Sequence, residues 1–159
     1  GQGVARFARE FGMRVLISAR PGSDSIPDDR VCFDDLLAEA DVVTLHCPLT
    51  EETRNLFGAD QFQAMKSSAI LINTARGGLI DSQALVDALT SGVITAAAVD
   101  VLPNEPPVHG DPLLDYDGGN LIVTPHIAWA TDTARQNAIN ELAANTRAFL
   151  AGKLRNRVV

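Results

Sequence analysis

Residues 69–99, AILINTARGGLIDSQALVDALTSGVITAAAV, decide the fold of this chain. The stretch begins with an apolar run, 69–73, and ends with a run of small residues, 95–99. Between the two runs, Asp81 is a plausible N-cap for an amphipathic helix, and Gly92 is placed to end that helix. A strand, a helix and a second strand in this order predict a βαβ unit with parallel strands.

The same alternation of short apolar runs and amphipathic stretches continues on both sides of this unit. Further strands are expected at 15–17, 41–46 and 121–124, and further helices at 4–10, 34–39, 60–65 (capped by Asp60) and from Thr131 or Asp132 to just before Gly152, with a polar loop at 21–29. Repeated strand-helix units with short connections predict an α/β fold, a doubly wound parallel sheet of the Rossmann type.

Composition excludes several classes of protein. The chain has 159 residues, enough for one well-filled domain, and its net charge of -7 argues against binding to nucleic acid. No apolar run approaches the roughly 20 residues that span a bilayer.

The two cysteines, Cys32 and Cys47, are too few for a disulfide framework and favour a cytoplasmic location. Cys32 has no partner at metal-ligand spacing and His109 is isolated, so we expect no metal site.

Ligands of doubly wound sheets bind at the carboxyl ends of the strands. The residues that follow the predicted strands are Ala19-Arg20, His46-Cys47-Pro48, Asn73-Thr74-Ala75-Arg76, Asp100 and Thr124-Pro125-His126.

Three side chains at or near these positions form a coherent set for reducing a 2-oxo acid. Arg76 offers a fixed fork of donors that suits a carboxylate. His126 can give or take a proton near neutral pH. Glu105, shortly after Asp100, can orient His126 and favour its charged form. Each residue alone has an ordinary explanation as a surface charge or loop residue; their common placement at the strand ends favours a reaction centre.

Three segments resemble motifs of the D-isomer-specific 2-hydroxyacid dehydrogenases. They are NTARGGLID at 73–81, DVLPNEPP at 100–107 and TPHIAWA at 124–130. Glu105 follows Arg76 by 29 positions and His126 follows Glu105 by 21, which is the order and spacing of the family. HCPLT at 46–50, with Thr53 soon after, is similar to the adenosine-side loop of these enzymes.

The resemblance implies a role for each matching residue. Arg76 would bind the substrate, Glu105 would support the base, and His126 would be the acid and base. The expected cofactor-binding residues are Gly1, Ala19, Arg20, Cys47, Pro48, Thr53, Thr74, Ala75, Arg76, Asp100, His126, Ala128 and Trp129. Asp100 among them would contact the nicotinamide amide.

The resemblance also implies a division of the chain. Gly1 would correspond to the last glycine of the family's glycine-rich turn, so the chain would lack the first strand and most of that turn. Residues 1–130 would form the dinucleotide-binding domain. Residues 131–159 would form a long helix and a return segment towards a substrate domain that is not included. This chain alone would then be an incomplete enzyme.

The end of the segment at 15–17 bears on the choice of cofactor. Many family members carry an acidic residue there, which binds the ribose hydroxyls of NAD. This chain has Ala19 at that position, followed by Arg20. Without the carboxylate a 2′-phosphate is not repelled, and Arg20 could pair with it. The sequence therefore favours NADP over NAD.

The predicted function is hydride transfer between a nicotinamide cofactor and a small 2-oxo or 2-hydroxy acid. Residues 128–130 favour a glycerate dehydrogenase or hydroxypyruvate reductase, acting on hydroxypyruvate, glyoxylate or D-glycerate. Two alternatives stay open: a phosphoglycerate or D-lactate-type dehydrogenase of the same family, and a dinucleotide-sensing corepressor or scaffold on the same fold. The resemblance also implies a homodimer.

Overall fold

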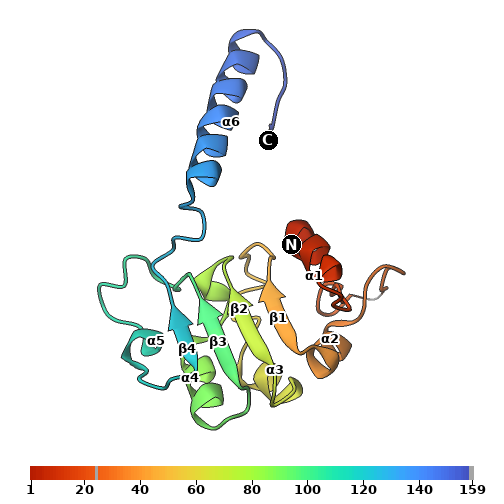
Figure 1. Cartoon of the computed structure of the whole chain (residues 1–159), viewed down its shortest axis with the longest axis vertical. Coiled ribbons are helices and arrows are strands. Elements are labelled where there is room, and N and C mark those ends of the chain that lie inside the picture. The colour runs from red at the N-terminus through yellow and green to blue at the C-terminus, as the bar shows by residue number, and fades with distance from the viewer. Residues whose placement is uncertain (24, 158–159) are drawn as a thin grey trace. The chain divides into compact units, whose positions relative to one another are not determined.

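The computed structural model describes residues 1–23 and 25–157 (Figure 1). Asp24 of the predicted polar loop and residues 158–159 of the predicted return segment lie outside the described residues. The chain divides into two compact units, residues 1–125 and 126–159, which are described separately.

The first unit is built on a parallel four-stranded sheet. Its strands are β1 (Val42–Leu45), β2 (Ile70–Asn73), β3 (Ala96–Val99) and β4 (Leu121–Val123). All three pairings are parallel, and the strands lie side by side in chain order. The predicted α/β class with a parallel sheet is therefore confirmed.

Helices connect consecutive strands of this sheet. The helices of the first unit are α1 (Gln2–Glu10), α2 (Phe33–Glu39), α3 (Ala59–Ala64), the 3-10 turn η1 (Gly77–Leu79), α4 (Ser82–Thr90) and α5 (Pro112–Asp115). α3 joins β1 to β2, α4 joins β2 to β3, and α5 joins β3 to β4. Since parallel crossovers share one hand, these three helices cover the same face, where α4 contacts both α3 and α5.

Side-chain caps explain where several helices begin. The Asp81 carboxylate accepts the amide of Ala84 at 3.0 Å and caps α4, as predicted. α3 differs from the prediction, because Gly58 and not Asp60 is its N-cap. There the Gln61 side chain accepts the Gly58 amide at 3.1 Å, and the N-cap lies two residues earlier than predicted.

The strand predicted at 15–17 does not join the sheet, so that prediction is wrong. Only an isolated bridge forms, between Ser18 and Val31. In it the amide of Val31 donates to the Ile17 carbonyl at 2.9 Å, and the amide of Ala19 donates to the Val31 carbonyl at 2.8 Å. The described sheet consists of β1 to β4, and the segment at 15–17 pairs with none of these strands.

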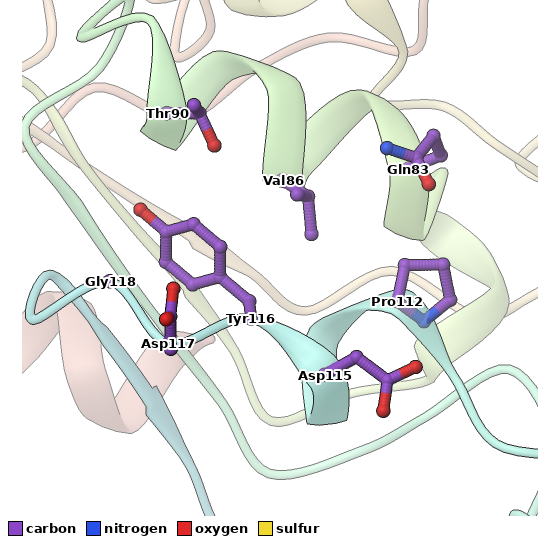
Figure 2. A pocket seen from close by; sticks show the side chains of 8 residues that line it. All are labelled: Gln83, Val86, Thr90, Pro112, Asp115, Tyr116, Asp117 and Gly118. Atoms are coloured by element: carbon purple, nitrogen blue, oxygen red, sulfur yellow. The ribbon is translucent and has the colours of Figure 1, made fainter.

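A hollow of about 560 Å³ lies between α4 and the α5 segment (Figure 2). Gln83, Val86, Thr90, Pro112, Asp115, Tyr116, Asp117 and Gly118 line it. A Cβ on Gly118 would lie 2.1 Å from the Tyr116 hydroxyl, so glycine makes room for the ring. That hydroxyl donates to the Asn120 side chain at 2.7 Å. None of the predicted site residues lines this hollow.

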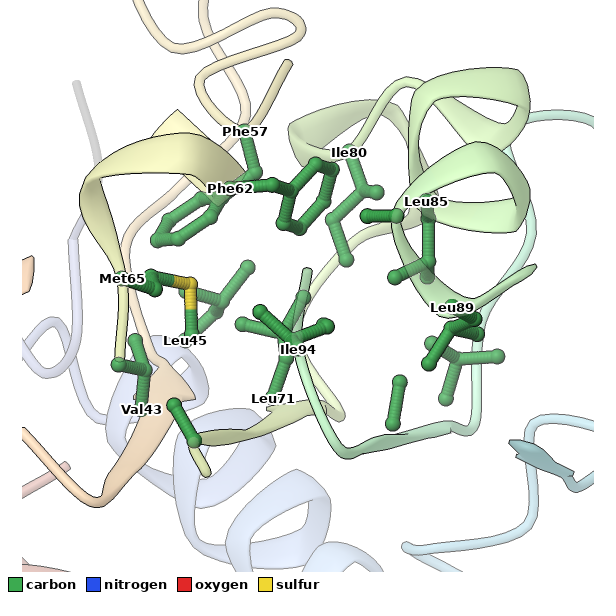
Figure 3. Packing of buried hydrophobic residues seen from close by; sticks show 14 of the residues in the cluster. Val43, Leu45, Phe57, Phe62, Met65, Leu71, Ile80, Leu85, Leu89 and Ile94 are labelled. Atoms are coloured by element: carbon green, nitrogen blue, oxygen red, sulfur yellow. The ribbon is translucent and has the colours of Figure 1, made fainter. Parts of the chain in front are cut away.

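One apolar core lies between the sheet and the helices on its covered face (Figure 3). Its members include Val43, Leu45, Phe57, Phe62, Met65, Leu71, Ile80, Leu85, Leu89 and Ile94. Alternate strand residues point into it, as the burial of Val43 and Leu45 in β1 shows. The opposite face is more open, and Ile122 keeps 64% of its surface exposed.

The second unit consists of a loop and the long helix α6 (Asp132–Leu150). Thr131 caps it by accepting the Ala134 amide at 3.2 Å, and Gly152 follows its end with φ +64, both as predicted. Arg155 pairs with Glu141 at 2.7 Å beyond the helix end. In the described part of the chain, no helix has both the length and the apolar character needed to cross a membrane.

Removal of a buried core side chain should test this packing. Phe62→Ala should lower the free energy of unfolding by about 3–5 kcal/mol, because it deletes a ring that is 1% exposed and leaves a cavity. Phe11→Ala, at a ring that is 80% exposed, is the matched control and should change stability far less. Urea unfolding followed by circular dichroism measures both, and equal losses would contradict the assigned core.

Candidate active site

The carboxyl ends of three strands are tied together by backbone hydrogen bonds. The amide of Asp100, just after β3, donates to the carbonyl of Asn73, the last residue of β2, at 2.9 Å. The amide of Thr124, just after β4, donates to the Val99 carbonyl at 2.9 Å. The segments that follow these strands therefore start from one edge of the sheet, as the sequence predicted.

The loop that carries Arg76 is folded around a buried side chain. Asn73 is fully buried, and its Oδ1 accepts the Ala75 amide at 3.0 Å while its Nδ2 donates to the Arg76 carbonyl at 2.9 Å. The same carbonyl accepts the Leu79 amide at 3.2 Å, which starts the 3-10 turn η1. The Arg76 carbonyl therefore accepts two hydrogen bonds, which fix the backbone at this residue.

The Arg76 side chain itself is exposed, as a group that meets a substrate must be. Its Nη1 donates to the Ala75 carbonyl at 2.6 Å, which uses one of the five donors of the guanidinium. Thr74 is exposed and Ala75 is half-buried on the same loop. The arrangement can offer a bidentate fork to a carboxylate.

Gly77 permits a close approach between the Arg76 loop and the segment after β3. A Cβ at Gly77 would lie 2.0 Å from the carbonyl carbon of Leu102 and 2.3 Å from its oxygen. At Gly78 a Cβ would meet the flexible side chains of Leu49, at 3.0 Å, and Arg54, at 3.7 Å. Gly77 is therefore the position at which the two loops touch backbone to backbone.

The two carboxylates predicted for the site lie on that touching segment. Asp100 is 4% exposed, and its Oδ1 accepts a hydrogen bond from the Thr124 hydroxyl. Glu105 is exposed, and its Oε1 accepts the Leu102 amide at 2.8 Å. The first unit thus brings the segments of Arg76, Asp100 and Glu105 to one edge of the sheet.

His126, Ala128 and Trp129 belong to the second unit and are described within it. His126 has φ +52, a left-handed conformation that is uncommon for a residue other than glycine and often found at functional sites. Its carbonyl accepts the Trp129 indole N–H at 2.8 Å, and the Ala130 amide donates to the Ile127 carbonyl at 2.8 Å. These bonds hold residues 126–130 in a compact turn.

Residues 46–53 form a loop that Thr53 holds in shape. The Thr53 hydroxyl accepts the Thr50 amide at 2.7 Å and donates to the Pro48 carbonyl at 2.7 Å. Burial raises the pKa of the half-buried Cys47 thiol, which keeps it protonated and a poor nucleophile. Cys47 can therefore contribute contact to a ligand and not covalent chemistry.

The start of α1 lies beside the end of β1 and suits an anion. A Cβ on Gly1 would be 3.3 Å from His46 Cβ, so the N-cap of α1 sits against the residue that follows β1. No side chain caps α1, and its first turn carries no acidic residue. Free amides at a helix N-terminus attract a phosphate, so this end fits the pyrophosphate of a dinucleotide.

A smaller hollow of about 110 Å³ adjoins the end of the segment at 15–18. Ala19, Arg20, Pro21, Gly22, Ser23, Ile26, Cys32, Phe33 and Asp34 line it. Ala19 is buried, Arg20 is exposed, and the exposed Asp34 lines the same hollow. The charge of Arg20 also contributes, after the Thr50 hydrogen bond, to the lowered pKa of the Glu52 carboxyl.

Sequence reasoning missed two residues of this region. Asn73 belongs to the motif at 73–81 but was not among the predicted site residues, although an asparagine that ends a strand before a loop can form a turn through its side chain. Asp34 was expected only as part of a short helix. Nothing in the local sequence shows that it lines the hollow beside Ala19.

Comparison with known proteins agrees with this geometry. Residues 1–128 match the family described as D-isomer specific 2-hydroxyacid dehydrogenase, NAD binding domain. Glycerate dehydrogenase of Methylorubrum extorquens is 48% identical over 99% of this chain and 49% of its own length. The chain spans about half the length of the curated relatives it matches.

Solved structures give the same result. The D-isomer specific 2-hydroxyacid dehydrogenase of Lactobacillus delbrueckii ssp. bulgaricus, in its NAD complexed form, superposes with a TM-score of 0.86 at 30% identity. That alignment covers 100% of this chain and 52% of the other. An acyclic imino acid reductase in complex with NADPH and D-Arg has a TM-score of 0.81 at 32% identity, over 100% of this chain and 50% of the other.

A methyl group at Gly77 should disrupt the contact between the two site loops. Gly77→Ala should lower the free energy of unfolding by about 1–3 kcal/mol or more, since rigid backbone and not a side chain occupies the space. In Gly3→Ala, the matched control on α1, the new methyl meets nothing within 4 Å, and we expect no loss. Urea unfolding measures the stability of both variants. An unchanged unfolding midpoint for Gly77→Ala would refute the backbone contact.

Proposed function

The chain belongs to the D-isomer specific 2-hydroxyacid dehydrogenase family, and from this premise we propose that the whole protein is an NAD(P)-dependent oxidoreductase of small 2-oxo and 2-hydroxy acids. The observation that carries this proposal is the backbone contact at Gly77. It sets the loop of the exposed Arg76 against the segment that leads to Glu105. A bound nicotinamide would supply or accept the hydride at the substrate carbon.

Arg76 is the proposed substrate-binding residue. Its loop is fixed by the buried Asn73, while the guanidinium stays exposed. A fixed fork of donors holds a carboxylate in one orientation, which directs the neighbouring 2-oxo carbon.

His126 is the proposed acid and base, with Glu105 as its supporting carboxylate. In the reducing direction His126 gives a proton to the oxygen of the 2-oxo group as that oxygen gains negative charge, and in the oxidising direction it takes the proton back. The left-handed backbone of His126 supports a functional constraint at this position. Glu105 would orient the imidazole and stabilise its charged form.

The proposed cofactor contacts come from several segments. Gly1 and the start of α1 would bind the pyrophosphate, and the loop of Cys47, Pro48 and Thr53 would line the adenosine side. Asp100 would contact the nicotinamide amide. The other proposed contacts are Ala19, Arg20, Thr74, Ala75, Arg76, His126, Ala128 and Trp129.

The proposed cofactor preference is for NADP over NAD. Ala19 offers no carboxylate to repel a 2′-phosphate, and Arg20 beside it is exposed. The structurally similar acyclic imino acid reductase is in complex with NADPH, which supports this preference. Asp34, which lines the same hollow, acts against this preference because its charge would repel a phosphate. The preference therefore depends on which charge lies nearer to the bound ribose.

The proposed substrates are hydroxypyruvate, glyoxylate or D-glycerate. Glycerate dehydrogenase of Methylorubrum extorquens, 48% identical, supports this choice. We further propose a cytoplasmic homodimer, in which residues 1–130 form the dinucleotide-binding domain and residues 131–159 a helix and return segment. The two free cysteines favour a reducing compartment.

Turnover by the whole protein tests the proposal directly. Oxidation of NADPH and NADH at 340 nm should depend on added hydroxypyruvate or glyoxylate. His126→Ala should lower turnover by roughly 10²–10⁴-fold with cofactor binding retained, since proton transfer contributes about that much. Cofactor binding without turnover on any short 2-oxo acid would favour a dinucleotide-sensing protein instead.

Two substitutions in the hollow beside Ala19 test the cofactor preference. Ala19→Asp should shift the ratio of kcat/KM for NADPH to that for NADH towards NADH, because it restores a carboxylate next to the ribose. Asp34→Asn should shift the same ratio towards NADPH, since it removes the opposing charge. Steady-state kinetics with both cofactors measure the ratios, and two unchanged ratios would remove this hollow from cofactor selection.

A further inference from the structure

Asn73 is the one fully buried polar side chain at the carboxyl edge of the described sheet, with 0% of its surface exposed. It is the last residue of β2. Its carboxamide instead makes two bonds to the loop that follows, one to the Ala75 amide and one to the Arg76 carbonyl. Both bonds run from the rigid end of a strand to the residue proposed to bind substrate, or to its neighbour.

The chemistry at this position calls for an amide. The bond to the Ala75 N–H needs an acceptor, and the bond to the Arg76 carbonyl needs a donor. Of the side chains of this length, only a carboxamide supplies both. An aspartate would keep the acceptor and place a second oxygen against the Arg76 carbonyl, while a serine could keep one bond at most.

The backbone of Asn73 adds a third link. Its carbonyl accepts the Asp100 amide at 2.9 Å, across the β2–β3 pairing. Through its side chain and its main chain, this residue is bonded both to the Arg76 loop and to the start of the Asp100–Glu105 segment. The close approach of Gly77 to the Leu102 backbone is a further contact between the same two segments.

We propose that Asn73 is the positioning residue of the site: its carboxamide holds the Arg76 loop so that the guanidinium points at the carboxylate of a 2-oxo acid. This inference rests on the proposed function, because it assigns the residue that makes Arg76 selective. Asn73 touches neither substrate nor cofactor in this scheme and acts through Arg76.

A matched control separates positioning from ordinary stability. Asn120 also donates through Nδ2 to backbone carbonyls, those of Leu89 at 3.4 Å and Thr95 at 3.1 Å. It precedes β4, at the amino end of the strands, whereas Asn73 ends β2 at their carboxyl end. Asn120→Asp therefore removes the same kind of bond on the side of the sheet away from the site.

The test uses the whole protein with NADH or NADPH and hydroxypyruvate. Asn73→Asp and the uncharged Asn73→Ser should raise the KM for hydroxypyruvate by roughly tenfold to a hundredfold, as misplacement of a binding group does. The dissociation constant of the cofactor should stay within about twofold in both variants. Asn120→Asp should lower the thermal midpoint and leave both constants unchanged.

A double-mutant cycle shows whether Asn73 acts through Arg76. In an Arg76→Lys background the fork is already lost, so Asn73→Ser should change KM far less than in the wild type. Equal effects in both backgrounds would overturn the proposal, as would Asn73 variants that lose cofactor binding and thermal stability in step with KM. An inactive wild type would instead refute the proposed function.

Discussion

The backbone contact between Gly77 and the Leu102 carbonyl constrains much of the candidate site. With 2.0 Å between the place of a Cβ and the Leu102 carbonyl carbon, no side chain larger than hydrogen fits there. The contact joins two loops that leave neighbouring strands, and each loop carries a residue proposed for the reaction. A sheet edge alone would bring these loops to the same region, but the missing Cβ is what allows them to touch.

The architecture of the first unit could be predicted from the sequence because its signals are local. Apolar runs followed by capped amphipathic helices identified β2, α4 and β3, and Asp81 caps α4 as predicted. The segment at 15–17 shows the limit of this reasoning. Its apolar residues satisfy the composition of a strand, yet a strand also needs a neighbour to pair with, and periodicity carries no information about neighbours.

The sequence predicted which residues form the candidate site, but it did not predict which residues hold them in place. Arg76, Asp100 and Glu105 were identified because polar groups after parallel strands gather at one edge. Asn73 was not predicted, because its proposed positioning role depends on contacts within its own loop. An asparagine at that place in the sequence also fits an ordinary turn. The helix α5 was missed for a related reason, since four residues held by an Asp111 cap give too short a pattern to detect.

Cofactor selection cannot be read from one position of this chain. The absence of an acid at Ala19 points one way, but two opposite charges, those of Arg20 and Asp34, line the same hollow. Arg20 follows the bridged segment, and Asp34 lies in the first turn of α2. At an exposed surface each interaction is screened and individually small, so the balance among them decides. A substitution at Arg20 or Asp34 should therefore tune the preference gradually and not switch it.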